Sequence, residues 1–188
     1  MTSVRIYAAT SLDGFAADGE GSIEWLERFE PHNYGYESFL AGIGCIILGR
    51  RTYELVRAIG EWPYRGKRVM VLASEPLWNL PDGTTYVGTG LEAAVQAARA
   101  MTPQDIWIAG GAITMQTALD AGLVDILEIF IVPVMLGTGI PLVNPLESHQ
   151  KLAFDGSEAF DDGVVKLRYR PLGWTVSPTG RRTMTFSG

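Results

Sequence analysis

Cysteine and histidine are scarce in this sequence, with one cysteine and two histidines among 188 residues. Cys45 stands alone, so neither a disulfide within the chain nor a multi-cysteine metal site can form. His32 and His149 lie in polar, loop-like surroundings without partners at metal-ligand spacing. We therefore expect an intracellular protein without a metal site.

Long apolar runs and an excess of basic residues are also missing. No apolar stretch reaches the roughly 18 residues that a membrane span needs. The first residues enter a strand pattern without a basic-then-apolar signal segment. The net charge of −6 argues against a protein that binds a phosphate backbone. These absences predict a cytoplasmic protein that contacts neither membrane nor nucleic acid.

Two common nucleotide-binding motifs are absent. The sequence contains no Gly-x-Gly-x-x-Gly fingerprint and no Gly-x-x-x-x-Gly-Lys-Ser/Thr phosphate loop. An ordinary Rossmann dehydrogenase and a P-loop enzyme are therefore disfavoured.

What the sequence does contain is an alternation of strand-length apolar runs with helix-compatible segments. The apolar runs cover residues 4–9, 45–48, 68–73, 105–109 and 126–134. The clearest helical segments cover residues 52–59, 91–101 and 113–121. This order predicts a mainly parallel sheet with helices on both faces, while late strands near 151–154 and 164–170 predict antiparallel additions. We expect one α/β domain over residues 1–170, followed by an extension of uncertain structure over 171–188.

A basic strand-to-helix turn follows the buried run at 45–48. Its residues are Gly49, Arg50, Arg51 and Thr52. Free backbone N–H groups at a helix start attract phosphate, glycine permits close approach, and two guanidinium groups add charge-assisted hydrogen bonds. The turn is therefore a candidate anion site, although a solvated basic helix start explains it equally well.

A second glycine-bearing turn follows the apolar run at 105–109. Its residues are Gly110, Gly111, Ala112, Ile113 and Thr114. In open α/β sheets ligands bind outside the carboxyl ends of the strands, so paired glycines at that edge suggest a ligand site. The alternative is a tight turn that needs glycine for its backbone conformation.

Two further strand ends carry polar residues. Ser74 follows the run at 68–73, where its hydroxyl could hold a phosphate or ribose or could cap a helix. Asp13 and Gly14 follow the first strand, and this pair is either an ordinary turn or a site with a catalytic carboxylate.

Taken in order, these segments resemble the dihydrofolate reductase superfamily, and most closely its branch that includes the reductase domain of the bifunctional riboflavin-biosynthesis deaminase-reductases. The matching pieces are residues 11–14, 49–54, 71–74, 109–112 and 133–139. The resemblance extends to about residue 170 and implies a dihydrofolate-reductase-like fold with NADPH as the cofactor.

The resemblance also implies roles for particular residues. The adenosine side and pyrophosphate of NADPH would be bound by Gly49, Arg50, Arg51 and Thr52, and Arg51 would favour NADPH over NADH. Leu72 and Ser74 would lie near the adenosine and its 2′-phosphate. The pyrophosphate and nicotinamide end would be lined by Gly110, Gly111, Ala112, Ile113 and Thr114. Ala9 and Ala16 would lie by the nicotinamide carboxamide, and the loop at 21–25 is similar to the mobile loop that closes over it.

Two departures from the family pattern narrow the expected activity. Dihydrofolate reductases carry an acidic residue for the pteridine where this chain has Asn33, with Glu37 one turn later. This difference argues against reduction of folate itself. The sequence also lacks the His-x-Glu and Pro-Cys-x-x-Cys signature of the zinc deaminase domain, so a reductase module is expected.

The reaction implied is direct hydride transfer from NADPH to a C=N or C=O bond, in a site that holds the two together and excludes water. The proton could come from Asp13, from Glu37 or from an ordered water. Tyr34 and Tyr36 could line a flat substrate pocket or could pack in the core.

The leading hypothesis is an NADPH-dependent reductase of a small pterin-like or pyrimidine-like heterocycle. The alternative is a nucleotide-binding module of the same fold that has no catalytic activity. The family is commonly dimeric and the apolar run at 126–134 could pair between subunits, so we expect a homodimer.

Overall fold

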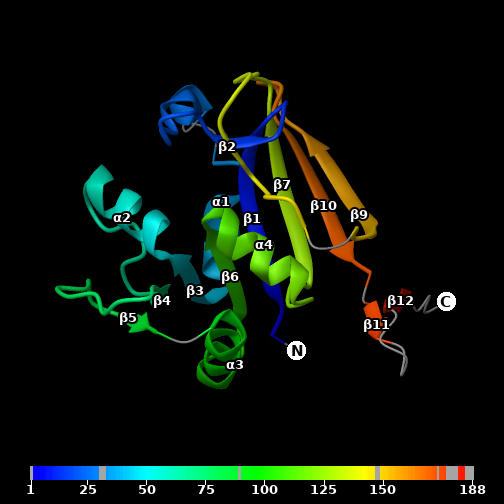
Figure 1. The fold of residues 1–188 in the computed structure, drawn as a ribbon. Coiled ribbons are helices and arrows are strands. Elements are labelled where there is room, and N and C mark those ends of the chain that lie inside the picture. Colours follow the sequence, from blue (N-terminus) through cyan, green and yellow to red (C-terminus); the bar gives the residue numbers. More distant parts are fainter. Residues whose placement is uncertain are drawn as a thin grey trace.

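An eight-stranded mixed sheet forms the centre of the protein (Figure 1). The computed structural model describes residues 2–29, 33–88, 90–146, 149–172, 174–176 and 182–184. The spatial order of the strands is β5-β4-β3-β6-β1-β7-β10-β9. Their bounds in chain order are β1 (Val4–Ser11), β3 (Ile43–Gly49), β4 (Arg68–Leu72), β5 (Thr84–Val87), β6 (Asp105–Gly110), β7 (Ile126–Val132), β9 (Leu152–Ala159) and β10 (Val165–Pro171).

The sheet is parallel through most of its width. Every pairing from β5 across to β7 is parallel, whereas β10 runs antiparallel to β7 and β9 runs antiparallel to β10. A short turn is enough to join β9 to β10, because antiparallel neighbours need no crossover. The predicted α/β fold, a mainly parallel sheet with antiparallel C-terminal strands, is confirmed.

Helices cover both faces of the sheet, as predicted. The helices are α1 (Tyr36–Ala41), α2 (Arg50–Ile59), α3 (Leu91–Met101), α4 (Ala112–Asp120) and the 3-10 helix η1 (Glu24–Phe29). Helices α3 and α4 bury residues such as Val95 and Met115 against one face. Helices α1 and α2 bury Phe39 and Tyr53 against the other face. Among the described residues, no helix has the length and apolar composition needed to cross a membrane.

Short strands lie outside the main sheet. Strand β2 (Phe15–Ala17) pairs with β8 (Ile140–Pro141), and β11 (Trp174–Val176) pairs with β12 (Arg182–Met184). The first pair joins the turn after β1 to the segment after β7. This connection fixes the loops that rise above the carboxyl end of β1 (Figure 1).

Strand β7 occupies an interior position in the sheet. Its residues pair with β1 on one side and with β10 on the other. The prediction that the apolar run at 126–134 pairs between subunits is therefore wrong, because both edges of this strand are already used. Among the described residues, the outermost strands of the main sheet are β5 and β9.

One carboxylate is buried beneath α1. Glu128 of β7 is 1% exposed and forms ion pairs with Arg5 of β1 and, at 3.1 Å, with Lys166 of β10. Burial alone would raise the pKa of Glu128, but hydrogen bonds and charge from Arg5 and Lys166 hold it below its usual range. Glu128 is therefore ionised and joins three neighbouring strands.

Candidate functional site

The two glycine-bearing turns meet at the carboxyl edge of the sheet. Strands β3 and β6 are parallel neighbours, and Gly49 and Gly111 are the N-caps of the helices that follow them. A Cβ atom on Gly49 would lie 2.6 Å from the Oγ1 atom of Thr114, and one on Gly111 would lie 3.1 Å from that of Thr52. The third residue of each helix therefore covers the glycine that caps the other.

Three helix N-termini at this edge lack side-chain caps. The N-caps are Gly49 for α2, Gly90 for α3 and Gly111 for α4, and none supplies a side-chain hydrogen bond. Within the described chain, the first N–H groups of these helices consequently have no side-chain cap, and the helix dipoles add positive potential. This arrangement suits an anionic group with several oxygen atoms, such as a pyrophosphate.

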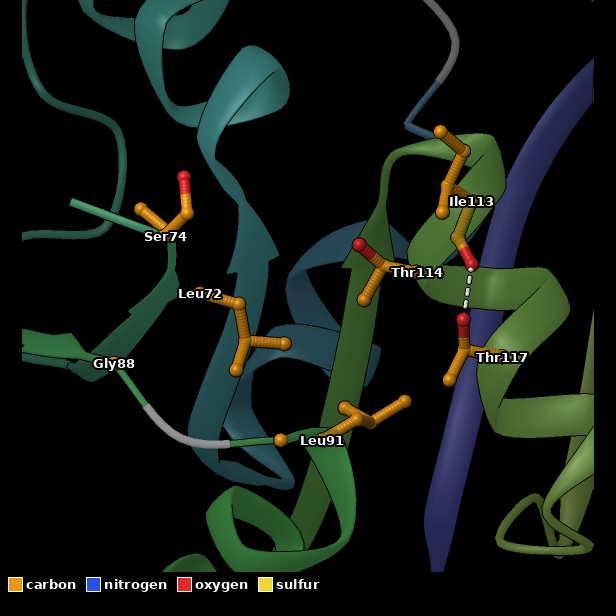
Figure 2. A pocket seen from close by; sticks show the side chains of 9 residues that line it. Leu72, Ser74, Gly88, Leu91, Ile113, Thr114 and Thr117 are labelled. Atoms are coloured by element: carbon orange, nitrogen blue, oxygen red, sulfur yellow. Dashed lines mark hydrogen bonds between the residues drawn. The ribbon is translucent and has the colours of Figure 1, made fainter.

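A pocket of about 440 Å³ opens beside these turns (Figure 2). It is lined by Leu72, Ala73, Ser74, Gly88, Gly90, Leu91, Ile113, Thr114 and Thr117. Figure 2 shows Leu72 and Ser74 on one side and the first turn of α4 on the other, with Leu91 at the start of α3. The hydroxyl of Thr117 donates to the carbonyl of Ile113 at 2.9 Å. Four of the predicted cofactor residues, Leu72, Ser74, Ile113 and Thr114, thus line one pocket.

The two arginines at the start of α2 differ in their surroundings. Arg50 pairs with Glu54 at 2.8 Å and with Glu75 at 3.6 Å. Arg51 is exposed, and no carboxylate of the described residues pairs with it. The charge of Arg51 is therefore available to a ligand at this edge.

The remaining predicted cofactor residues are not among those that line this pocket. Gly110 is buried, has a φ of 136° and precedes a cis peptide bond to Gly111. Ala112 opens α4. Ala9 packs in the cluster of Phe130 beneath η1, whereas Ala16 of β2 packs against the core under α3 and α4.

Asp13 connects the turn after β1 to the loop after β7. Its carboxylate accepts hydrogen bonds from the Ser11 hydroxyl at 2.6 Å and from the backbone N–H groups of Leu136 and Gly137 at 3.1 and 2.7 Å. The hydrogen bond from Ser11, helped by the two backbone donors, lowers the pKa of Asp13 from 3.8 to about 2. At neutral pH this carboxylate is ionised and can only accept.

The predicted substrate and proton-donor residues of the α1 region have different environments. Glu37 is exposed in the first turn of α1. The Tyr34 hydroxyl donates to the carboxylate of Asp162 in the β9–β10 turn. Tyr36 packs its ring against Trp107, with centroids 6.1 Å apart. The hydrogen bond of Tyr34 thus joins the segment before α1 to the β9–β10 turn. The ring of Tyr36 belongs to the aromatic cluster around Trp107.

The structure describes one of the two histidines. His149 is exposed, and His32 lies outside the described residues. Among the residues that the structure describes, no group of three or more His, Cys, Asp or Glu side chains is placed to hold a metal ion.

Sequence reasoning missed a third glycine-bearing turn. Gly88 and Gly90 follow the short strand β5 and precede α3, and both line the pocket with Leu91. The signal was available, because two glycines stand directly before the predicted helix at 91–101. It was missed because the strand before them was not recognised.

Comparisons with known proteins agree with this architecture. Residues 2–166 match the family model of the RibD C-terminal domain. The uncharacterized protein YwjB of Bacillus subtilis is 35% identical over 166 residues, which are 87% of this chain and 95% of that protein. The uncharacterized protein YyaP of the same organism is 27% identical over 178 residues, 86% of this chain and 90% of that protein.

Solved structures show the same fold. A putative riboflavin biosynthesis protein from Shewanella sp. PV-4 superposes with a TM-score of 0.80 at 29% identity, covering 90% of this chain and 99% of that one. The diaminohydroxyphosphoribosylaminopyrimidine deaminase/5-amino-6-(5-phosphoribosylamino)uracil reductase of Thermotoga maritima superposes with a TM-score of 0.63 at 15% identity. That match covers 90% of this chain and 56% of the longer protein.

Proposed function

The chain belongs to the RibD C-terminal domain family, and from that premise we propose that it is an NADPH-dependent reductase that transfers a hydride to a small pterin-like or pyrimidine-like heterocycle. Members of this family are typically NADPH-dependent reductases. The observation that carries the proposal is the junction of the two glycine turns, where uncapped helix N-termini converge beside a pocket of about 440 Å³.

The residues present fit the cofactor. At the junction, Gly49 and Gly111 let the two turns pack closely against Thr114 and Thr52. The amides that follow these glycines have no side-chain cap among the described residues and can donate to a pyrophosphate. Leu72 and Leu91 offer apolar surface to an adenine, while Ser74 offers a hydroxyl to the ribose side. When bound, NADPH supplies the hydride, and these residues hold and orient it.

Arg51 is the proposed partner of the 2′-phosphate. It stands at the start of α2 with its charge uncompensated among the described residues. Arg50 is assigned to the pyrophosphate side, where its ion pairs with Glu54 and Glu75 would limit its freedom. A guanidinium group suits a phosphate because its N–H groups donate in a fixed fork.

Water is the proposed source of the proton. Asp13 is an acceptor with a pKa of about 2, so its role in this proposal is to position the loop at 136–137. Glu37 is exposed on α1 and could at most orient a water molecule near the substrate. Closure of the segment around η1 would exclude bulk water from the reacting atoms.

Titration of the protein with NADPH and NADH, followed by cofactor fluorescence, tests the proposal. We expect saturable NADPH binding, and we expect Arg51→Ala to weaken NADPH by about ten- to a hundredfold, the range for a charge-assisted hydrogen bond. NADH should be little affected. Arg65→Ala serves as the control, since Arg65 is an exposed arginine paired with Glu61. Absence of saturable NADPH binding would contradict the proposed cofactor, and equal losses for both cofactors would remove Arg51 from its role.

A second candidate is a nucleotide-binding module without catalysis. It is favoured by the low pKa of Asp13 and by the exposure of Glu37, which leave the described site without a buried acid. Mixing the NADPH-loaded protein with dihydrofolate and with pyrimidine precursors of riboflavin separates the two candidates. Oxidation of NADPH with either compound supports the reductase, and tight NADPH binding without any oxidation supports the module.

We also propose that the protein is a cytoplasmic homodimer. Strand β9 is an outermost strand of the sheet as described, and Phe154 and Leu152 on it are 63% and 39% exposed. Long exposed edges with apolar side chains are surfaces that proteins tend to cover.

A further inference from the structure

Charged residues adjoin the pocket of about 440 Å³ but do not line it. None of the residues in its lining carries a charge. The segments that meet at this edge of the sheet are residues 49–54, 72–75, 88–92 and 110–117. Their charged residues are Arg50, Arg51, Glu54, Glu75 and Glu92. Because glutamates outnumber arginines in this set, side-chain charge gives no net attraction to a phosphate group, and the position of each charge becomes important.

Glu75 stands at the ribose side of this edge. It directly follows Ser74, which lines the pocket and which we assign to the ribose (Figure 2). The Oε2 atom of Glu75 lies 3.6 Å from the Nη1 atom of Arg50. Because β3 and β4 are parallel neighbours, this ion pair joins the segment after β4 to the first residue of α2. The carboxylate of Glu75 therefore lies at the edge where the cofactor turn begins.

The ion pair with Arg50 holds Glu75 only weakly. The side chain of Glu75 is 78% exposed, and an exposed ion pair contributes little stability. Arg50 also has a closer partner, because its Nε atom lies 2.8 Å from the Oε1 atom of Glu54. A ligand can therefore draw Glu75 away while Arg50 keeps Glu54 as its partner.

NADPH and NADH differ at the group that Glu75 would meet. The adenosine ribose carries a 2′-phosphate in NADPH and a 2′-hydroxyl in NADH. In dinucleotide-binding folds a carboxylate accepts a hydrogen bond from the 2′-hydroxyl, whereas an arginine accommodates the 2′-phosphate. Like charges that face each other disfavour binding. This edge presents both kinds of residue, with Arg51 suited to the phosphate and Glu75 suited to the hydroxyl.

We infer that Glu75 broadens the cofactor range of the site, so that NADH binds with an affinity within about tenfold of that of NADPH. This inference rests on the proposed function. Arg51 attracts the 2′-phosphate and Glu75 repels it, so the phosphate adds less to binding than an arginine alone would provide. NADH lacks the repelled group and finds an acceptor for its 2′-hydroxyl in Glu75.

Titration with NADPH and with NADH, followed by cofactor fluorescence, measures the ratio of the two dissociation constants. We expect a wild-type ratio within about tenfold. Glu75→Gln should raise the preference for NADPH by about three- to tenfold, because it removes one charge beside a doubly charged group. Binding of NADH should not become tighter.

The outcomes separate this inference from the proposed function. If neither cofactor binds, both are contradicted. If both cofactors bind and Glu75→Gln leaves the ratio unchanged, the inference alone is overturned. A wild-type preference for NADPH well above about tenfold would overturn it as well.

Glu54→Gln is the matched control, because it removes the other carboxylate partner of Arg50. Glu54 lines a separate surface pocket on α2 and does not line the pocket beside Ser74. We expect Glu54→Gln to leave the ratio unchanged. Equal increases in Glu54→Gln and Glu75→Gln would show that release of Arg50 causes the effect, and would overturn the direct role of Glu75.

A double variant tests whether Glu75 acts on the phosphate or through Arg51. In the Arg51→Ala background, Glu75→Gln should still raise the preference for NADPH by about three- to tenfold, because repulsion by the carboxylate does not require the guanidinium. Disappearance of the effect in this background would show that Glu75 acts through Arg51, which contradicts the inference.

Salt dependence distinguishes a charge effect from a change in structure. The difference between wild type and Glu75→Gln should shrink as the NaCl concentration rises from about 0.05 M to about 0.5 M, because salt screens exposed charges. The melting temperatures of the two proteins should be nearly equal, since the ion pair lost is exposed. A difference in cofactor preference that high salt leaves undiminished would overturn the electrostatic role of Glu75.

Discussion

Gly49 sits where the backbones of two turns come within contact distance, and a methyl group there has no space. Its Cβ atom would lie 2.6 Å from the Thr114 hydroxyl and 3.4 Å from the Gly111 nitrogen. Overpacking of this kind costs about 1–3 kcal/mol. For a chain of this length we expect Gly49→Ala to lower the melting temperature by about 2–10 °C, measured by thermal unfolding without cofactor.

Two further variants identify the cause of that loss. Gly90→Ala is the control, because Gly90 is also a helix N-cap and nothing lies within 4 Å of its Cβ position. Adding Thr114→Ala to Gly49→Ala removes the obstructing hydroxyl and should restore part of the stability. If the stability loss of the double variant equals the sum of the losses of the two single variants, the close contact does not explain the effect of Gly49→Ala.

Because of Asp13, the stability of the protein should vary with pH in the acid range. Its folded pKa is lowered from 3.8 to about 2 by the Ser11 hydroxyl and two backbone donors. Stabilisation from a lowered pKa is present above the unfolded value and disappears as the pH falls towards the folded one. Asp13→Asn should therefore be less stable than wild type at neutral pH. The difference in their free energies of unfolding should disappear as the pH falls from about 4 to about 2.

Urea denaturation across that pH range measures this difference in the free energy of unfolding. Asp82→Asn is the control, an exposed aspartate for which the structure shows no side-chain hydrogen bond or ion pair. A difference between Asp13→Asn and wild type that persists at the lowest pH would show that the carboxylate charge is not its source.

Some individual residues of the candidate site could be predicted from the sequence alone. Ser74, Ile113 and Thr114 were predicted because each follows a buried apolar run, whereas Leu72 was implied by the family resemblance. All four line the pocket. The hydrogen bonds of Asp13 could not be predicted, since its donors at 136–137 stand more than 120 positions away in the chain. The same holds for Tyr34, whose partner Asp162 belongs to a late turn.

Among the elements, β7 depends on charges from both of its neighbours. Glu128 of β7 lies between Arg5 of β1 and Lys166 of β10, and its side chain is 2% exposed. Breaking a buried ion pair from one side costs about 3–5 kcal/mol, because the remaining charges stay buried. We expect Glu128→Gln to lose stability of this order, measured by denaturant unfolding.

The control for this prediction is an exposed ion pair. Glu61 and Arg65 are 3.6 Å apart with side chains 86% and 73% exposed. Glu61→Gln should change the free energy of unfolding by less than about 1 kcal/mol. Similar losses for the two variants would mean that burial does not set the strength of the Glu128 network.

Element boundaries were predicted best where local signals were strong. Helix α3 covers Leu91–Met101 as expected, because an alanine-rich segment follows a glycine. Strand β7 ends at Val132, before the predicted limit, since Pro133 cannot donate to the ladder. Strand β5, Thr84–Val87, was missed because its four residues have little apolar pattern and are held by pairing with β4.

For the whole molecule, we predict a homodimer that uses the antiparallel edge of the sheet. Phe154 of β9 is 63% exposed, and β9 has no second neighbouring strand among the described residues. Light scattering after gel filtration should give twice the 20.5 kDa mass of the chain, and Phe154→Lys should shift the protein towards monomer. Trp78→Lys changes another exposed aromatic residue, which lies outside β9, and should leave the measured mass of the assembly unchanged. A monomeric wild type would contradict the prediction.

The fold class could be predicted from the sequence, whereas the strand order could not. Buried runs separated by helices indicate a parallel sheet, and the structure confirms one. The order of the strands depends on long-range pairing, and periodicity along the chain carries no information about it. This is why β7 was expected to have an edge available to another subunit, although β1 and β10 occupy both of its sides.

The crossed contacts between the two glycine turns restrict how this sequence can change in evolution. Thr114 covers Gly49, and Thr52 covers Gly110 and Gly111, although about sixty positions separate the two turns in the chain. A larger residue at one position is tolerable only if its partner becomes smaller in the same lineage. Among relatives, positions 49 and 114 should therefore vary together, as should positions 52 and 111.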